Sequence, residues 1–400
     1  MFRNKTILII SQLDWGDMFI SKHHYALELS KLGNTVYYVN GPAPKEKLRK
    51  GKVLVEPSGF ENLFVVKHSF FFPRFLGFKA RWLFNLLIQI HIKRILKRIK
   101  QTEPLIVWSF DISNTLPLKF FPEDSFKIFM PVDEPHVQLA IDAAESAQVI
   151  FSVTKEIISK YHIYNVPKLF INHGVGTYFI NEAVSATINN PVKVGLSGNF
   201  FRPDIDRQTL VNIINENPEV DFNFWGSTSN KKINTKGTIN DSLGGHNNDP
   251  GTLKFIEALN SLENVTMHGS LKPMILCSEL QKMDAFLICY DIIKDQSKGT
   301  NYHKVMEYLA CGKVIISNNI TTYNAHPGLL LMTASRNNND ELPALFKQAL
   351  DNLSAYNSYE KQQERIDFAR QYLYKKQIIK IENFIVENFK QMNTYQWFGI

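Results

Sequence analysis

The 400-residue sequence is poor in cysteine and has no long hydrophobic run. Its three cysteines, Cys277, Cys289 and Cys311, form no C-x-x-C pair, which excludes a disulfide scaffold or a zinc ribbon and fits a reducing compartment. No uninterrupted apolar stretch approaches the ~18–20 residues needed to span a bilayer. We therefore expect a cytoplasmic protein, attached at most peripherally to the inner face of the cell membrane.

The sequence also lacks the glycine-rich signatures of two common nucleotide-binding classes. Residues 12–19, QLDWGDMF, follow the first apolar run and hold one glycine where a dinucleotide-binding turn has three. No Walker A motif occurs, and no histidine–carboxylate cluster has the spacing of metal ligands. The sequence therefore argues against dinucleotide-dependent redox chemistry and P-loop chemistry, and it predicts neither a metal nor a cofactor.

Acidic residues are missing from one part of a chain whose net charge is +7. Residues 1–180 hold 23 Lys/Arg against 15 Asp/Glu, and nine of these cations lie between Glu61 and Glu103 with no acid among them. Within this segment, apolar residues recur at helical spacing: Phe84, Ile88, Ile92, Ile95 and Ile99. Residues 67–100 thus predict a helix that rests on an anionic membrane surface, or a domain helix whose apolar stripe packs on its own sheet. Nucleic acid is not an expected partner, because no recognised motif accompanies the charge.

Short apolar runs alternate with amphipathic stretches along most of the chain. Strands are predicted at 6–11, 35–39, 62–66, 105–110, 127–130, 149–153 and 168–172, and again at 192–198, 221–226, 264–269, 284–290 and 313–317. Strands that alternate with helices indicate parallel sheets with helices on both faces. The restart after the polar stretch 181–191 predicts two doubly wound, Rossmann-like α/β domains, with a cleft between the carboxyl edges of their sheets. Residues 227–251, rich in Gly, Asn and Ser, are expected to form a long surface loop.

The first strand of the second half ends at a glycine. Gly198 and Asn199 open a loop that carries Arg202. A small residue at a strand end lets a ligand approach the backbone, and the amides at the next helix start can bind a phosphate. Arg202 would add a guanidinium to the same phosphate. The alternative is that Gly198 forms only a turn and that Arg202 is solvated.

Residues 301–317, NYHKVMEYLACGKVIIS, predict a helix followed by a strand. Lys304 and Glu307 are three residues apart and are therefore neighbours on the helix surface. A lysine near a helix start can neutralise a diphosphate, aided by the terminal amides, and a glutamate one turn later can accept hydrogen bonds from ribose hydroxyls. The alternative is an ordinary surface ion pair.

This segment as a whole resembles the sugar-nucleotide motif N-x-x-K-x-x-E-Y-L-A-x-G-K-P-V of GT-B glycosyltransferases, close to family 4 and to the teichuronic acid and xanthan glucuronosyltransferase-like groups. The matching residues are Asn301, Lys304, Glu307, Tyr308, Leu309, Ala310, Gly312 and Lys313, with Val314 where proline is usual. Weaker likenesses lie at Asn264-Val265 with His268-Gly269, at Asp284, and at Asn172-His173-Gly174-Val175.

The resemblance implies two domains with different tasks. Residues 1–180 would form the acceptor-side domain and residues 190–378 the nucleotide-sugar-binding domain, with a C-terminal helix at about 380–400 that packs back on the first. The donor-binding residues implied are Gly198, Asn199, Arg202, Gly226, His268, Gly269, Asn301, Lys304 and Glu307.

One departure concerns stereochemistry. Retaining family 4 enzymes commonly carry an acidic residue eight positions before the helix glutamate, where this chain has Gly299. Retention is therefore not carried over to this chain, although Asp291 and Asp295 lie near enough in sequence to substitute in space.

The acceptor side is expected to hold the base. Residues 131–134, PVDE, resemble the V-D-D/E segment of the glucuronosyltransferase-like group. In an inverting reaction a carboxylate takes the proton of the acceptor hydroxyl, and Asp133 at a strand's carboxyl edge is our candidate for this base. The alternative is a helix N-cap. Gly16, Asp17 and His23 follow the first strand, where the GT-B architecture meets the acceptor or the transferred sugar.

The resemblance thus implies a metal-independent glycosyltransferase of cell-surface polysaccharide assembly. It would move a sugar from a UDP- or GDP-sugar, as co-substrate, to a glycan or lipid-linked acceptor. A GT-B sugar-nucleotide epimerase and a degenerate protein that binds a sugar nucleotide without turnover are the alternatives.

Overall fold

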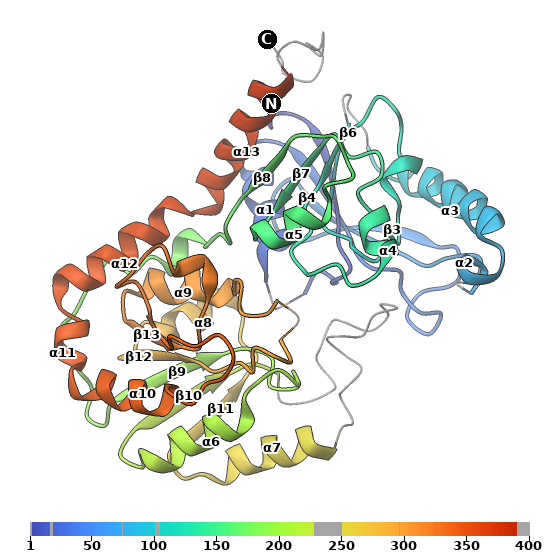
Figure 1. Ribbon diagram of the computed structural model, residues 1–400. Helices are drawn as coiled ribbons and strands as arrows, with labels where there is room; N and C mark the ends of the chain where they lie inside the picture. Colours follow the sequence, from blue (N-terminus) through green and yellow to red (C-terminus); the bar gives the residue numbers. More distant parts are fainter. Residues whose placement is uncertain are drawn as a thin grey trace.

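Two α/β units make up the computed structural model, each built on its own sheet (Figure 1). The structure describes residues 2–16, 19–73, 75–100, 105–227, 250–295 and 297–389. Among the described residues, no helix has the length and apolar character needed to cross a membrane.

The first unit contains an eight-stranded sheet in the order β3-β4-β2-β1-β5-β6-β7-β8, with every neighbouring pair parallel except β3 and β4. Its strands are β1 Thr6–Ile10, β2 Thr35–Val39, β3 Val53–Pro57, β4 Leu63–His68, β5 Leu105–Ser109, β6 Phe126–Phe129, β7 Val149–Ser152 and β8 Lys168–Phe170. The helices between them are α1 Ser21–Lys31, α2 Leu76–Lys79, α3 Arg81–Leu96, α4 Gln138–Asp142 and α5 Lys155–Lys160.

The second unit contains a six-stranded parallel sheet in the order β11-β10-β9-β12-β13-β14. Its strands are β9 Lys193–Ser197, β10 Asp221–Trp225, β11 Val265–Gly269, β12 Ala285–Ile288, β13 Val314–Ser317 and β14 Leu331–Met332. Its helices are α6 Arg207–Glu216, α7 Pro250–Ser261, α8 Pro273–Leu280, α9 His303–Cys311, α10 Leu342–Asp351, α11 Leu353–Tyr356 and α12 Tyr359–Gln371.

The predicted α/β class with two doubly wound units is confirmed, because two sheets, parallel except for the β3–β4 pair, carry the alternating pattern of strands and helices. All five residues of β1, TILII, are buried, as expected of a parallel strand covered on both faces. Each predicted strand overlaps an observed one, whereas β3 and β14 were not predicted. Most of the predicted surface loop at 227–251 lies outside the described residues.

The last described helix, α13 Tyr374–Phe389, crosses from the second unit to the first (Figure 1). Its residues Ile378, Ile381 and Ile385 are buried in the same hydrophobic core as β1 and β5. A parallel bridge between Val175 and Leu373 ties the two crossing segments together. Residues 390–400, which complete the predicted C-terminal helix, lie outside the described part of the chain.

The apolar stripe of residues 67–100 packs inward. Ile88, Ile92 and Ile95 of α3 are fully buried, and Ile99 is nearly so, all in the core of the first unit. This stripe is therefore core, as the alternative of a helix that packs on its own sheet predicts. The reason is that the sheet needs an apolar cover, and these side chains supply it. Contact of other side chains of residues 67–100 with an anionic membrane stays a prediction.

Candidate functional site

Three strands of the second sheet end in glycines that lie close together. The Gly198 N–H donates to Trp225 O (2.8 Å), and the Gly226 N–H donates to Gly269 O (2.9 Å). A Cβ added to Gly226, whose φ is +157°, would lie 1.5 Å from Gly198 O. Only glycine fits there, so the carboxyl ends of β9, β10 and β11 present bare backbone at one edge of the sheet.

Lys304 lies directly over this edge. Its Nζ donates to the hydroxyl of Tyr290 (2.7 Å), and a Cβ added to Gly198 would approach Nζ to 2.7 Å. With Gly198 and Tyr290, Lys304 lines a small pocket at the end of β9. Helix α9 begins one residue earlier, without a capping side chain and without an acid in its first turn. An ammonium and a positive helix end thus converge where a phosphate could approach Gly198.

Glu307 lies one turn further along α9 and is buried, with 8% of its surface exposed. Burial raises the pKa of its carboxyl from about 4.5 to about 8, although the nearby Lys304 opposes this shift. Its Oε1 lies 3.5 Å from Nδ1 of His303. The carboxyl therefore keeps its proton at neutral pH and can both donate and accept hydrogen bonds.

The predicted phosphate ligand Arg202 is already engaged. Its Nε donates to both carboxylate oxygens of Asp204 (2.8 and 3.0 Å), and its Nη2 pairs with Asp204 and, at 3.4 Å, with Asp295. These carboxylates raise the pKa of the guanidinium, although burial opposes the shift. Asn199 accepts the Phe201 N–H and so shapes the same turn.

The predicted donor-binding residues Asn301 and His268 contact residues other than Lys304. The Asn301 amide donates to Val153 O (3.0 Å) and to Asn172 Oδ1 (2.7 Å), so it ties the start of α9 to the first unit. His268 is exposed on β11 and stacks on Trp225 at 5.0 Å, with its Nε2 2.8 Å from Asn223 Oδ1.

Gly299, which stands where retaining members have an acid, lies in a loop held by several contacts. Gly299 has φ +67°, donates its N–H to Asp295 Oδ2 (3.0 Å), and would place a Cβ 2.8 Å from Asn319 O. Asp295 also accepts from Tyr302 and is 1% exposed. Asp291 pairs with Lys294 at 2.6 Å. Asp295 is therefore engaged by its own loop and by Arg202, and Asp291 is engaged by Lys294.

His23, predicted on the acceptor side, is buried and bonded within the first unit. The Ile20 N–H donates to its Nδ1 (3.2 Å), and its Nε2 lies 3.1 Å from the hydroxyl of Tyr38. Burial lowers the pKa of this imidazole to about 3. His23 therefore holds the start of α1 to β2. Gly16 lies half-buried in the preceding loop, and Asp17 lies outside the described residues.

The neighbouring His24 reaches the second unit instead. Its ring stacks on Tyr374 of α13 at 4.7 Å and lies 6.4 Å from the ring of His303 on α9. His173 meets His303 edge-on at 5.5 Å. Burial lowers the pKa of His24 and of His173 well below the usual value. The pair His23-His24 lies in a segment predicted to face the cleft, but no local pattern predicts that His24 meets His303 beside Glu307.

Asp133 lies after β6 and is exposed, with no hydrogen-bond partner among the described residues. Helix α4 begins later and has Val137 at its N-cap, so the capping interpretation of Asp133 is wrong. Asp111, by contrast, is 3% exposed and accepts the N–H groups of Ser113 and Thr115. Burial lowers the pKa of the Lys22 ammonium, whereas Asp133 and Asp111 oppose this shift. Asp133 is thus an exposed carboxylate, without a hydrogen-bond partner in the described part of the chain, just after the carboxyl end of β6.

Comparisons with known proteins bear on the fold. No protein-family model matches the chain, and no curated protein matches its sequence. Sucrose-phosphate synthase from Thermosynechococcus elongatus superposes with TM-score 0.67 at 12% identity, over 96% of this chain and 99% of that one. An α,α-trehalose-phosphate synthase (UDP-forming) from Burkholderia vietnamiensis gives 0.67 at 10%, over 97% and 100%. Anabaena HepE, in complex with UDP and glucose, gives 0.62 at 12%, over 97% and 100%.

The fold is therefore GT-B. In this GT-B chain the groups described above come from both units: Lys304 and Glu307 from α9, His24 from α1, and Asp133 from the end of β6. Within the described ranges, no group of three or more His, Cys, Asp or Glu side chains is placed to hold a metal ion.

Proposed function

We propose that this chain is a glycosyltransferase that moves a sugar from a nucleotide diphosphate sugar to an acceptor hydroxyl. The observation that carries the proposal is the position of Lys304 over Gly198 at the uncapped start of α9, with Glu307 buried one turn along. UDP and GDP both offer what this arrangement would recognise, a diphosphate next to a ribose. The membership in family 4 or the glucuronosyltransferase-like group rests on the motif at 301–317.

The leaving diphosphate gains negative charge as the bond to the sugar breaks. Lys304 would stabilise that charge, because its ammonium already lies beside Gly198 before the reaction. The positive end of the α9 dipole would add to this effect. Glu307 would bind the ribose hydroxyls. In this proposal Arg202 acts through Asp204 and Asp295, as a support for the loop.

The attacking hydroxyl must lose a proton, and we assign this step to Asp133. It is a free carboxylate on the opposite unit, beside the buried Lys22. An inverting transfer needs one such base, and Gly299 leaves no acid at the position that retaining members use. The acceptor class that we propose is a glycan or lipid-linked glycan of cell-surface polysaccharide assembly, at the cytoplasmic face of the membrane.

The experiment is nucleotide release. Parent and Asp133→Asn proteins are incubated with UDP-glucose, UDP-glucuronate or GDP-mannose and a glycolipid extract, and free UDP or GDP is measured. The parent should release nucleotide with one donor, and Asp133→Asn should do so ~10²–10⁴-fold more slowly while binding the same nucleotide equally well. Asp142→Asn, whose carboxylate pairs with Arg81 on the outer flank, is the matched control.

Other outcomes would replace the proposal. Binding without release from any donor would favour the non-catalytic binding protein. Conversion of the donor sugar to its epimer, with no acceptor needed, would favour the epimerase.

A further inference from the structure

A second apolar stripe remains on α3 after its core-facing side is accounted for. Trp82 is 73% exposed, Leu86 49% and Ile90 38%. Phe75, just before α2, is 55% exposed. Large apolar side chains gathered on one exposed helix face are typical of an interaction surface rather than of a solvated one.

The helix geometry places this stripe opposite the core. With about 100° of rotation per residue, Trp82, Leu86 and Ile90 fall within an arc of about 80°, roughly opposite the buried isoleucines of α3. Lys93 and Lys97 fall within the same arc. The exposed side of α3 is therefore apolar in its first half and cationic in its second half.

Positive charge surrounds the stripe without acidic compensation along the chain. The exposed cations between Leu76 and Lys100 are Lys79, Arg81, Lys93, Arg94, Lys97, Arg98 and Lys100. Arg81 lies 3.5 Å from Asp142, and the Arg94 guanidinium lies 4.0 Å from the Phe71 ring centre. Lys93 and Lys97 have no ion pair within the described ranges. Nothing in the described fold therefore neutralises the line of charge that continues the apolar stripe.

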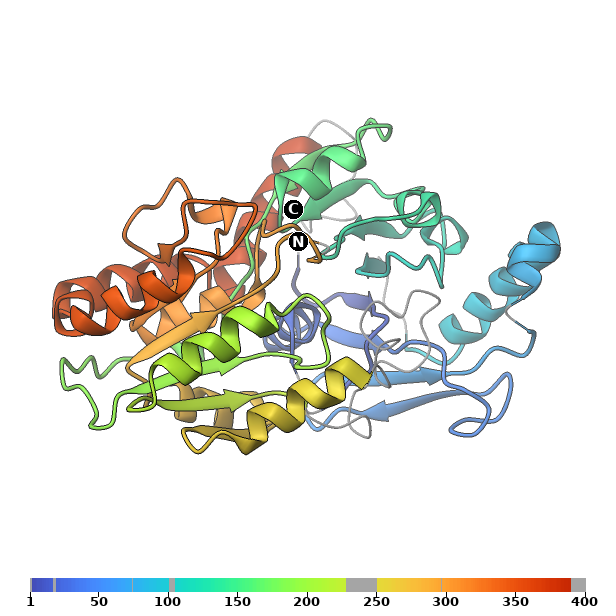
Figure 2. The ribbon, with the colours of Figure 1, turned by 60° about the horizontal axis from the view of Figure 1, so that its bottom comes forward.

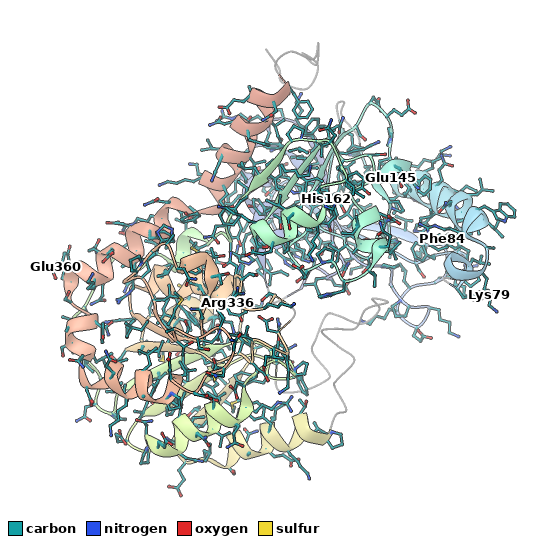
Figure 3. All side chains as sticks on the ribbon, viewed as in Figure 1. Lys79, Phe84, Glu145, His162, Arg336 and Glu360 are labelled. Carbon is teal, nitrogen blue, oxygen red and sulfur yellow. The ribbon has the colours of Figure 1, made fainter. Side chains whose placement is uncertain are left out.

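The position of α2 and α3 leaves this side accessible. In two views the pair projects from the flank of the first sheet, on the side away from the second unit (Figures 1 and 2). Lys79 and Phe84 mark the two helices on this flank in Figure 3. The site around Lys304 lies in the other unit, so a surface bound at this flank would not occupy it.

We propose that the outer face of α2 and α3, formed by Phe75, Trp82, Leu86, Ile90, Lys79, Lys93 and Lys97, docks on an anionic lipid surface. Tryptophan favours the boundary between headgroups and acyl chains. Lysines extend their charged ends to lipid phosphates while their stems stay on the apolar side. A polar protein partner would not need four exposed apolar side chains, whereas a lipid surface accommodates them together with unpaired cations. The inference goes beyond the proposed transfer and does not depend on nucleotide binding.

The test is sedimentation with vesicles. Parent protein should sediment with vesicles that contain phosphatidylglycerol more than with pure phosphatidylcholine, and less at high salt, because salt screens the charges. Trp82→Gln/Leu86→Gln/Ile90→Gln should lose most of the binding, and Lys93→Gln/Lys97→Gln should weaken it about fivefold per cation removed.

Each variant has a matched control on another surface. Met274→Gln/Ile275→Gln/Ile293→Gln removes three exposed apolar side chains from the second unit, and Lys375→Gln/Lys376→Gln removes two exposed lysines from α13. Both controls should bind vesicles as the parent does. All these positions are exposed, so the variants should also unfold at the parent's temperature.

The depth to which Trp82 enters the lipid can be measured as a second test. Lipids brominated in their acyl chains should quench the fluorescence of the bound parent, and Trp82→Phe should lose most of this quenching while still sedimenting. Equal sedimentation with neutral and anionic vesicles, no sedimentation with either, or a triple glutamine variant that binds like the parent would overturn the proposal. Nucleotide release measured without lipid vesicles would be unaffected by any of these outcomes, so this failure is distinct from failure of the proposed function.

Discussion

Replacement of Glu307 by glutamine tests the electrostatics of the site in the absence of any ligand. The carboxyl is buried, and burial raises its pKa from about 4.5 to about 8. The folded chain therefore holds this proton up to about pH 8, whereas the unfolded chain releases it near pH 4.5. Glutamine keeps the shape and the hydrogen-bonding groups of the protonated acid and has no proton to lose.

The sign follows from the protons bound in each state. Between pH 4.5 and 8 the unfolded chain binds fewer protons than the folded one, so the free energy of unfolding falls as the pH rises. Each unit of pKa shift corresponds to about 1.4 kcal/mol. Burial of Glu307 thus lowers the free energy of unfolding by about 3 kcal/mol at pH 7. Above pH 8 the free energy of unfolding no longer falls on account of this group.

The assay is urea unfolding of the parent and the Glu307→Gln variant at several values between pH 5 and pH 8. The free energy of unfolding of the variant, relative to the parent, should rise by about 3 kcal/mol over this range. The buried histidines titrate in both proteins, so their contributions cancel in the difference.

Glu364→Gln is the control, because this carboxylate is exposed and pairs only with Lys361. It should follow the parent at every pH. Parallel curves for Glu307→Gln and the parent would contradict this prediction, since they would mean that the carboxyl ionises as readily in the folded chain as in the unfolded one.

Three further substitutions test the glycine edge of the second sheet and the packing of α3 on the first. Gly226→Ala should lower the free energy of unfolding by about 3 kcal/mol or more, because its Cβ would overlap a backbone oxygen. The control Gly59→Ala, also at positive φ but in open space, should lower it by about 1 kcal/mol. Equal losses in the two variants would contradict the overlap at Gly226. Gly198→Ala should displace the Lys304 ammonium and weaken UDP or GDP binding in calorimetry with little change in melting temperature, so intact affinity would count against this contact. Ile92→Ala should cost ~2–5 kcal/mol in urea unfolding, as for any fully buried core side chain, and a loss below ~1 kcal/mol would mean that α3 does not pack as described.

The sheets could be predicted because parallel strands buried on both faces read as unbroken apolar runs. The two strands that were missed lie at sheet edges, where this signal fails. β3, VLVEP, is half-exposed and ends in Pro57, and β14 is only two residues long. α3 shows a related limit: the sequence has apolar residues on two sides of this helix, and only the sheet beneath decides which side is core.

In the candidate site, too, contacts within one helix could be predicted from the sequence, whereas contacts between distant segments could not. Lys304 and Glu307 belong to one continuous helix, so their spacing alone brings them together. The surroundings of His24, by contrast, depend on α9 and α13, which come from distant parts of the chain. Likewise, Arg202 is held partly by Asp295, 93 residues away, and no local pattern reveals that contact.

Whether Lys304 binds the diphosphate of a nucleotide can be measured by calorimetric titration of UDP and GDP into the parent, Lys304→Ala and Lys282→Ala. Lys282 is an exposed lysine paired with Glu279, on the same unit and away from the glycine edge. One of the two nucleotides should bind the parent and Lys282→Ala with equal affinity. It should bind Lys304→Ala at least ~10-fold more weakly, because a charged contact to the diphosphate is lost. Equal affinity in all three proteins, or binding of neither nucleotide by the parent, would contradict the account.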